Sequence, residues 1–300
     1  MMHMIKMVWG SSDNPDKALG KAEAIKQYEY ISDGFVNKSI SQYYANEKQR
    51  KLDHPSPSSI TACRRVIWLD NKDVKHTNVL TWAKQMRLSL GRLLEDNLAK
   101  IFMQNKSLLA YMDDNNEQII LKKPVDGVLQ ELAVEKLQSK QFPGLTGVFD
   151  FLLDINGTVV VSDAKTARSD SFGYVPIDEA EVFEDLGWRN RKIQLTGYYI
   201  LCYENKDLFE KWGLPLPTAC HLFSYALDDG VVRREYIWQP TQADVEEFGL
   251  YYQNFMAGFN SKDMPDCTCT DFDVKFCKYG IEKKGGIYTS CCADFLDSTN

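Results

Sequence analysis

The spacing of apolar residues along the chain predicts several helices. Between residues 78 and 105 the apolar positions follow one helix face, at Leu80, Ala83, Met86, Leu90, Leu93, Leu94, Leu98 and Ile101. Residues 178–203 and 241–259 are also expected to be helical. A polar, loosely amphipathic helical region is expected over residues 13–52. The proline- and serine-rich segment 55–59 then breaks the chain and offers an N-cap for a short helix running through Trp68.

Short apolar runs between these helices predict strands. One is expected over residues 117–121. Two more, 147–153 and 158–162, are joined at Asn156-Gly157, a dipeptide typical of a tight hairpin turn. Residues 221–227 and 231–238 predict a second hairpin. Helices that alternate with strand pairs in this order favour an α/β fold with a central mixed β-sheet flanked by helices.

Composition and hydropathy narrow the class of protein. The chain has 300 residues, of which 44% are hydrophobic and 26% charged, as in ordinary globular proteins. It contains no run of 18 apolar residues, so no membrane span and no membrane partner are expected. Residues 1–9 lack the apolar stretch and cleavage site of a secretion signal, so an intracellular, cytoplasmic location is expected.

Charge is distributed unevenly along the chain. The net charge of −7 argues against a surface coated in nucleic acid. Residues 48–92 nevertheless hold ten Lys or Arg against three Asp, which gives this window a local charge of +7. Two interpretations remain open, a local groove for a nucleic-acid backbone and solvated helix faces.

Two carboxylates at the ends of short strands are the most informative chemical feature. Asp163 and Lys165 alternate along one strand and therefore share a face, and strand pairing across the hairpin can bring Asp150 beside Asp163. Two close carboxylates repel each other unless a cation lies between them. With a lysine on the same face they suit Mg²⁺ and a phosphodiester, so the first hypothesis is a metal-dependent nuclease. The alternative for Asp163 and Lys165 is an exposed ion pair.

Three further residues extend this candidate site. Glu95, on the long helix, can lean over the strand ends as a third oxygen ligand, although a solvated helix glutamate would look the same. Gln194 and Tyr198 are four residues apart on a predicted helix and share a face. They can contact phosphate oxygens or position the lysine, or can simply pack on the sheet.

In this order the motifs resemble the PD-(D/E)XK nucleases, and most closely their RecB-like branch. The residues that carry the resemblance are Gly147-Val148-Phe149-Asp150, then Asp163-Ala164-Lys165-Thr166, then Gln194 and Tyr198. The resemblance implies a restriction-endonuclease-like core over residues 55–260 with a helical N-terminal extension over 1–54. It also implies Mg²⁺ or Mn²⁺ held by Glu95, Asp150 and Asp163, a catalytic lysine at 165, and support from Gln194 and Tyr198. The family often has His where this chain has Glu95.

Cysteines add a second resemblance. Five of the eight lie in the last 34 residues, and Cys63 follows Ser58-Ser59 and precedes Arg64-Arg65. This motif is similar to one in RecB-like nucleases of the AddB and CRISPR-adaptation kind. In those proteins such a cysteine and three C-terminal cysteines together hold a [4Fe–4S] cluster. The implied cluster ligands are Cys63, Cys269, Cys277 and Cys291, with Cys267 and Cys292 as substitutes.

The cysteine assignment leaves alternatives open. The C-terminal spacing is less compact than the family's, Zn²⁺ suits the same four thiolates, and free cysteines in a loose C-terminal segment, 261–300, are the third possibility. Cys202 and Cys220 are expected to be core residues, as is His221 in its apolar strand.

The family likeness favours an exonuclease that acts on DNA ends, with single strands preferred, in recombination, repair or replication. Arg64, Arg65, Lys84 and Arg87 are the residues expected to contact the DNA backbone. A helicase, recombination or replication protein is the expected kind of partner. An endonuclease is a further alternative. The alternative from another class is a catalytically silent nuclease-fold module that binds DNA or protein in a repair or replication assembly.

Overall fold

The computed structural model describes residues 52–74, 82–114, 118–167, 186–226, 232–266, 281–283 and 287–289. By its internal contacts the chain divides into two units. One comprises residues 1–49 and 80–86, and the other residues 50–79 and 87–300. The first unit contributes only five described residues, 82–86, which are helical. The helix expected over 13–52 lies outside the described residues except for Leu52.

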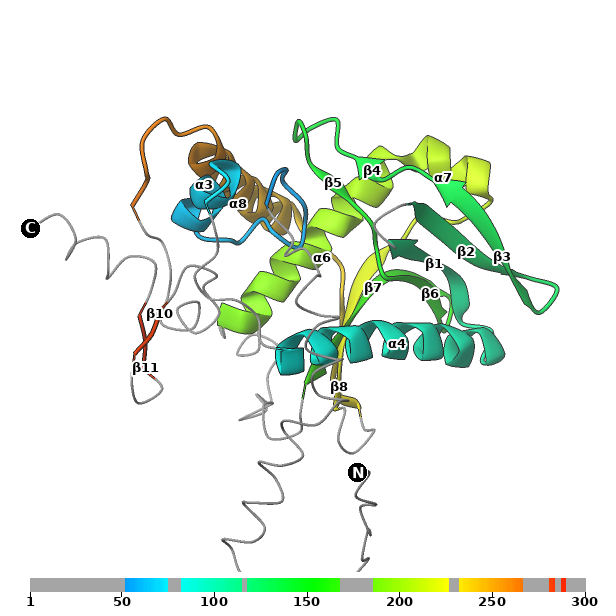
Figure 1. The fold of residues 1–300 in the computed structure, drawn as a ribbon. Coiled ribbons are helices and arrows are strands. Elements are labelled where there is room, and N and C mark those ends of the chain that lie inside the picture. Colours follow the sequence, from blue (N-terminus) through cyan, green and yellow to red (C-terminus); the bar gives the residue numbers. More distant parts are fainter. Residues whose placement is uncertain are drawn as a thin grey trace, which may run out of the picture. The chain divides into compact units, whose positions relative to one another are not determined.

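A seven-stranded sheet forms the centre of the second unit (Figure 1), in the order β3-β2-β1-β6-β7-β8-β9. Its strands are β1 Leu108–Asp114, β2 Ile119–Val125, β3 Val128–Val134, β6 Phe151–Ile155, β7 Thr158–Ala167, β8 Ala219–Ala226 and β9 Val232–Trp238. The β7–β8 pair is parallel and all other neighbouring pairs are antiparallel. The predicted mixed sheet is confirmed, although β1 and β3 were not among the predicted strands.

Four short strands lie outside this sheet. They form two antiparallel pairs, β4 Leu137–Gln138 with β5 Thr146–Gly147, and β10 Ile281–Lys283 with β11 Ile287–Thr289. The β5 strand ends three residues before Asp150, so the β4–β5 pair directly precedes the first candidate carboxylate in the chain.

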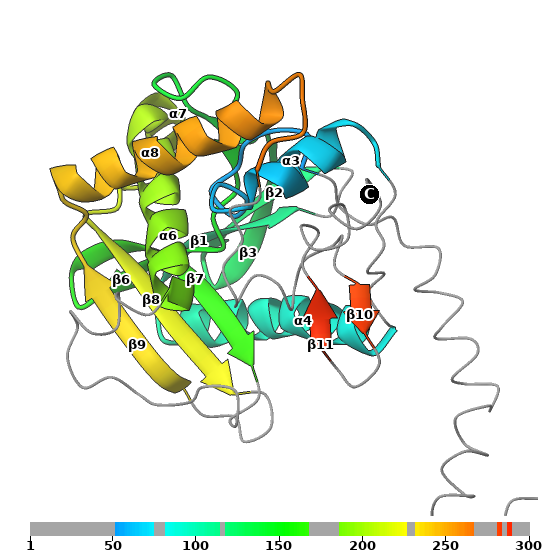
Figure 2. The ribbon, with the colours of Figure 1, turned by 90° about the vertical axis from the view of Figure 1, so that its left-hand side faces the viewer.

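Helices cover both faces of the large sheet (Figures 1 and 2). They are α3 Arg64–Asn71, α4 Trp82–Gln104, α6 Leu186–Glu204, α7 Lys206–Trp212 and α8 Gln242–Phe259. On one face Leu98 and Ala99 of α4 pack with Phe151 and Val160. On the other face α6 packs over the alternate residues of the same strands, such as Val161, and α8 packs against α6 and α3. Both faces of β6 and β7 are therefore buried, which explains their continuous apolar runs.

Two predicted helices differ in detail from those observed. The short helix begins at Arg64 and not within the serine segment, because the serines there hydrogen-bond to one another in turns. In α4, Leu93 and Ile101 are 60% and 49% exposed. The stripe that packs on the sheet includes Ala99 and Phe102 instead, so the helix is rotated relative to the predicted apolar face.

Other expectations are confirmed. Asn156 and Gly157 both have positive φ, 53° and 85°, as a two-residue hairpin turn of the Asn-Gly kind requires. The helix expected over 241–259 is α8, and its N-cap Thr241 forms a reciprocal capping box with Asp244. Cys202 and Cys220 are fully buried, and burial raises the pKa of both thiols.

Within the described part of the chain, no helix combines the length and apolar character needed to cross a membrane.

Candidate functional site

The candidate site lies at one end of the β6–β7 hairpin. Phe151 pairs with Ser162 in this antiparallel ladder, so the next positions outward, Asp150 and Asp163, stand opposite each other. Alternation along β7 puts Asp163 on the side of Val161, which is the side that α6 covers. Asp163 is 1% exposed and Asp150 is partly buried. The hairpin therefore brings together the two carboxylates that the sequence singled out.

The charges around Asp150 disfavour its ionised form. Burial raises the pKa of the Asp150 carboxyl well above its usual range, and the adjacent Asp163 raises it further. Lys165 opposes this rise in pKa, while Glu95 on α4 contributes to it. Glu95 is therefore near enough to act on Asp150 electrostatically, as its predicted position over the strand ends implied.

Lys165 is the cation of this cluster. Its Nζ lies 2.6 Å from Asp163 Oδ1 and donates a hydrogen bond to it. The Lys165 side chain is 28% exposed, whereas that of Asp163 is 1% exposed, so this is not the exposed ion pair of the alternative interpretation. An ammonium group that reaches both a buried carboxylate and solvent can meet an anionic substrate at the rim of the site.

Helix α6 supplies two neutral polar groups. Gln194 Nε2 donates to Asp163 Oδ1 over 3.2 Å, and Gln194 itself is 5% exposed. One turn later, burial raises the pKa of the Tyr198 hydroxyl, and the Asp150 and Asp163 charges raise it further. Hydrogen bonds from Gln194 and Ser58 oppose this rise. Gln194 therefore contacts Asp163 directly, and Tyr198 is near enough for both carboxylate charges to act on its hydroxyl.

Two groups at the site were not predicted for it. Arg191 is exposed, and its Nη1 donates to Gln194 Oε1 over 3.4 Å, so a guanidinium lies one helix turn before the glutamine. The i to i+3 spacing on α6 was a signal for this neighbour. Ser58, from a loop distant in sequence, acts to lower the pKa of Tyr198, and no local pattern indicates this effect.

The donor set fits a divalent cation with few protein ligands. Asp163 Oδ2 is buried and accepts no well-aligned hydrogen bond from the described residues, but the Lys165 Nζ lies 2.6 Å from it and neutralises part of its charge. A cation shared with Asp150 would relieve the remaining repulsion between the two carboxylates. In the same described residues no set of three or more His, Cys, Asp or Glu side chains is arranged to hold a metal ion. Mg²⁺ is commonly held by one or two carboxylates, water and substrate phosphate, so a two-carboxylate site suits it.

The basic residues expected to contact DNA do not gather at this site. Arg64 hydrogen-bonds to Asn254, and Arg65 Nε donates to the carbonyl of Pro265 over 2.9 Å. Both arginines thus hold α3 against α8 and the segment that follows it. The side chains of Lys84 and Arg87 lie outside the described residues.

The cysteine prediction is only partly covered by the described residues. Cys63 immediately precedes α3, and both Cys63 and Met264 pack against the cluster of Val66 and Leu69. The Arg65 hydrogen bond to the Pro265 carbonyl also holds the start of the cysteine-rich segment against α3. The remaining proposed ligands, Cys269, Cys277 and Cys291, and their substitutes Cys267 and Cys292, lie outside the described residues.

Comparison with known proteins identifies no family. No protein-family model matches the sequence, and no curated protein matches it. Among solved structures, the chain has a likeness to the protein described as "Crystal structure of SSO0001", with 14% sequence identity and a TM-score of 0.37. The match covers 87% of this chain and 98% of that one. The functional argument therefore depends on the geometry of the site.

Proposed function

We propose that this protein is a metal-dependent deoxyribonuclease of the PD-(D/E)XK kind. The observation that carries the proposal is the pairing of Asp150 with Asp163, with the Lys165 ammonium 2.6 Å from Asp163. A mixed sheet with helices on both faces is the setting expected of a restriction-endonuclease-like core. Holding Asp150 beside the buried Asp163, where burial and that neighbour raise the pKa of Asp150, is costly, and such arrangements cluster at functional sites.

In this proposal Asp150 and Asp163 hold Mg²⁺ or Mn²⁺, and Glu95 joins them. When bound, the ion supplies a Lewis acid for the phosphodiester and its attacking water. Gln194 fixes the orientation of the Asp163 carboxylate through its 3.2 Å hydrogen bond. Lys165 stabilises negative charge that develops on the phosphate and orients the water that attacks phosphorus.

The substrate proposed for this site is DNA, cleaved from its ends, with single strands preferred. The exposed Arg191 guanidinium, hydrogen-bonded to Gln194, is placed to contact a phosphate next to the scissile one. Phosphate contacts of this kind supply affinity without reading sequence. An exonuclease in a recombination, repair or replication assembly needs that lack of sequence preference.

The packing of Cys63 and Met264 on the same cluster, and the Arg65 hydrogen bond to Pro265, support a further proposed feature, a four-thiolate centre that closes the 261–300 segment on Cys63. A [4Fe–4S] cluster is the first candidate and Zn²⁺ the second. Either centre would link two ends of the second unit, as a long-range cross-link does.

Nuclease assays test the proposed function. End-labelled single-stranded, double-stranded and closed circular DNA would be incubated with Mg²⁺, with Mn²⁺, and with chelator. We expect metal-dependent shortening of linear DNA, with initial rates reduced at least about 100-fold in Asp163→Asn and Lys165→Met. Asp154→Asn is the matched control, because Asp154 lies in the same hairpin and accepts a hydrogen bond from Gly157 that asparagine can also accept. Wild-type cleavage that persists in chelator, or that is unchanged in Asp163→Asn, would contradict the proposal.

The second candidate function is a nuclease-fold module that binds DNA or protein without cutting. The observation that favours it is that no three-ligand metal group occurs among the described residues. DNA binding with no cleavage of any of the three substrates, under every metal condition, would select this candidate.

A further inference from the structure

A cavity of about 820 Å³ lies between strand β3, the segment around β4 and helix α7. Its size is within the range of cavities that bind ligands, roughly 300–1,000 Å³. Strand β3 is an edge strand of the large sheet, and its Leu132, which lines the cavity, is 46% exposed. None of the lining residues belongs to the carboxylate cluster, and the proposed function does not use this cavity.

Lysines give the cavity a positive charge. Three of its lining residues are basic, Lys136, Lys140 and Lys211, and one is acidic, Glu135. The lining therefore has a formal charge of +2, whereas the chain as a whole has a net charge of −7. A cavity with this excess of cations attracts an anionic ligand in preference to a neutral or cationic one.

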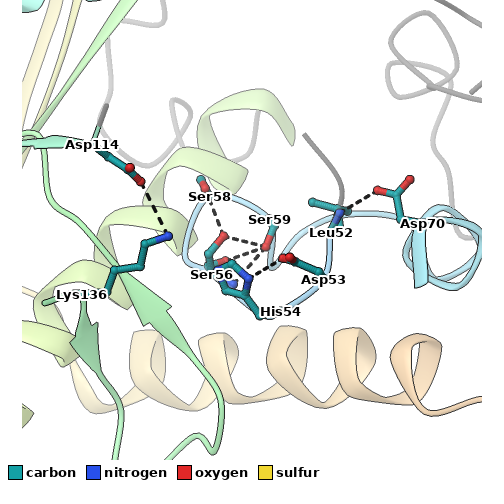
Figure 3. Close-up of polar contacts among 9 residues, drawn as sticks. All are labelled: Leu52, Asp53, His54, Ser56, Ser58, Ser59, Asp70, Asp114 and Lys136. Atoms are coloured by element: carbon teal, nitrogen blue, oxygen red, sulfur yellow. Dashed lines mark hydrogen bonds and ion pairs between the residues drawn. The ribbon is translucent and has the colours of Figure 1, made fainter. Parts of the chain in front are cut away.

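Lys136 is held at the cavity wall by an ion pair (Figure 3). Its Nζ lies 3.7 Å from Asp114 Oδ2, at the end of β1. This partner offsets part of the Lys136 charge and restrains its side chain, which is 34% exposed. Lys140 and Lys211 are exposed. These two lysines are therefore the ones placed to meet a ligand that enters from solvent.

The segment that carries Lys140 is fixed to the end of α6. The Glu204 carboxylate accepts a hydrogen bond from the Lys140 amide over 2.9 Å and another from the Gln141 amide over 3.0 Å. Asn205, which lines the cavity, donates from its Nδ2 to the Gln138 carbonyl over 2.8 Å. The cavity wall is therefore already formed, and a ligand does not have to order it on binding.

Apolar side chains complete the lining. Leu132 and Val134 come from β3, and Leu208 and Trp212 come from α7. The Trp212 carbonyl accepts a hydrogen bond from Lys123 Nζ over 2.8 Å, which holds the end of α7 against β2. Lysines beside apolar walls suit a ligand that has both anionic groups and apolar rings, as a nucleic-acid strand has in its phosphates and bases.

Helix α6 extends from the candidate site to this cavity. Gln194 contacts Asp163 at the site, and Asn205, which directly follows the last residue of α6, lines the cavity. The two residues are about three helix turns apart, which at 1.5 Å per residue is about 16 Å along the axis. One extended strand can therefore contact the site and the cavity at the same time.

We propose that the cavity between β3 and α7 binds the phosphate backbone of the DNA strand that reaches the candidate site. The inference rests on the proposed function, because it assigns a second contact to the same substrate. Lys140 and Lys211 contact phosphates, and the apolar walls accommodate a base or a sugar. Phosphate contacts of this kind add affinity and fix the position of the strand without reading its sequence.

Oligonucleotide binding tests this second contact. A fluorescently labelled single strand of about 16 nucleotides would be titrated with the full chain in Ca²⁺ at several salt concentrations and followed by anisotropy. The test variant combines Lys140→Gln with Lys211→Gln. The matched control combines Lys100→Gln with Lys262→Gln, two exposed lysines that do not line the cavity. We expect the test variant to bind about tenfold more weakly than the control at low salt, and its plot of log K against log salt to be shallower by about 1.4, the value for two phosphate contacts of a single strand.

Lysine acetylation locates the contact in the wild-type protein without any substitution. Free and oligonucleotide-bound protein would be treated with an acetylating reagent, and the modification of each lysine would be quantified by mass spectrometry. We expect the oligonucleotide to lower the modification of Lys140 and Lys211 and to leave that of Lys100 and Lys262 unchanged.

Three results would overturn the inference. The first is equal affinity of the test and control variants for the oligonucleotide. The second is equal modification of Lys140 and Lys211 with and without the oligonucleotide. The third is protection of these lysines by thymidine monophosphate to the same extent as by the oligonucleotide, because the cavity would then be a site for a free nucleotide and not for a strand.

The outcomes also separate this inference from the proposed function, because cleavage of the same oligonucleotide in Mg²⁺ is measured independently. If the wild type binds the oligonucleotide without cutting it, and Lys140 and Lys211 are protected, the nuclease proposal fails and the cavity assignment stands. If the wild type cuts the oligonucleotide and neither lysine is protected, the cavity assignment fails and the nuclease proposal stands. If the wild type neither binds nor cuts it, both are overturned.

Discussion

Asp150 is held where burial and the neighbouring Asp163 disfavour its ionised form. The paired strands leave them opposite each other, and burial raises the pKa of Asp150 before any neighbouring charge is considered. Lys165 offsets only part of that effect. The site therefore has a cost in stability, of the kind that proteins retain where the arrangement serves function.

Asp150→Asn tests this cost. Since the folded-state pKa of Asp150 is raised, the unfolded chain loses this proton more readily, and the group destabilises the fold increasingly as pH rises above about 4. In chelator at pH 8 we expect Asp150→Asn to raise Tm by roughly 2–4 °C, the change expected for about 1 kcal/mol. The gain should shrink as pH falls toward 4. Thermal unfolding of wild type and variant across this pH range checks both statements, with Asp154→Asn as control.

A Tm for Asp150→Asn that lies below wild type in chelator at pH 8 would contradict this account. It would mean that neighbouring groups stabilise the ionised carboxylate by more free energy than burial and repulsion cost.

At the scale of elements, α6 is the helix on which the site depends. It carries Gln194 and Tyr198 on one face, and its Gly197 faces Pro57 and Phe248 of α8. A Cβ at position 197 would lie 2.5 Å from Phe248 Cε2, and Phe248 is fully buried. The missing side chain at 197 thus permits the close approach of helix, loop and helix that places Tyr198 against the carboxylates.

Gly197→Ala should break this approach. We expect it to lower the unfolding free energy by about 1–3 kcal/mol, because the surrounding core cannot move to admit the methyl group. Gly249→Ala is the matched control on α8, since a Cβ there would meet Phe142 at an ordinary contact distance of 3.7 Å. That change should stabilise the protein by about 0.5–1 kcal/mol through helix propensity alone. Denaturant unfolding of both variants measures the difference, and a neutral Gly197→Ala would show that the contact is not tight.

At the scale of the whole sheet, His221 connects three adjacent strands. Its Nδ1 lies 2.8 Å from Ser162 Oγ on β7, and its Nε2 lies 3.0 Å from Glu235 Oε1 on β9. The side chain is only 4% exposed, and burial lowers the pKa of His221 although Glu235 acts in the opposite direction. The sequence-based expectation of a hydrogen-bonded core histidine is therefore confirmed, and the histidine links the sheet in its neutral form.

This link predicts how stability depends on pH. Because the folded-state pKa of His221 is lowered, the unfolded chain takes up the proton first. The contribution of His221 is therefore fully present above about pH 6.5 and is lost as pH falls below it, by at most about 1.4 kcal/mol per pH unit. His221→Gln should show a flatter dependence of unfolding free energy between pH 7 and pH 5. Equal slopes for wild type and variant would mean that His221 titrates normally in the folded protein.

How much of the fold follows from the sequence depends on how local its signals are. The Asn156-Gly157 turn sets the hairpin register, and that register decides that Asp150 and Asp163 face each other. Strand β3 has no such signal, since it is exposed on both faces and Val128 and Leu132 give no alternation of buried and exposed positions. Strand β1 follows α4 after only three residues, so its apolar residues look like a continuation of the apolar pattern of that helix.

The missed part of the site has a similar cause. Ser58 belongs to a segment whose own sequence indicates only a chain break, and the fit of the neighbouring Pro57 against Gly147 and Gly197 brings this segment to α6. Tertiary packing of this kind has no sequence period. Arg191 was within reach of prediction, because it precedes Gln194 by one turn on the same helix.

The central claim is that Asp150 and Asp163 share a divalent ion. Binding of Mn²⁺ to the full chain, followed by electron paramagnetic resonance of the free ion, tests it most directly. We expect the wild type and Asp154→Asn to bind Mn²⁺ with the same affinity, and Asp150→Asn and Asp163→Asn to lose that binding. Mn²⁺ binding that is unchanged in Asp163→Asn, or absent from the wild type, would contradict the account.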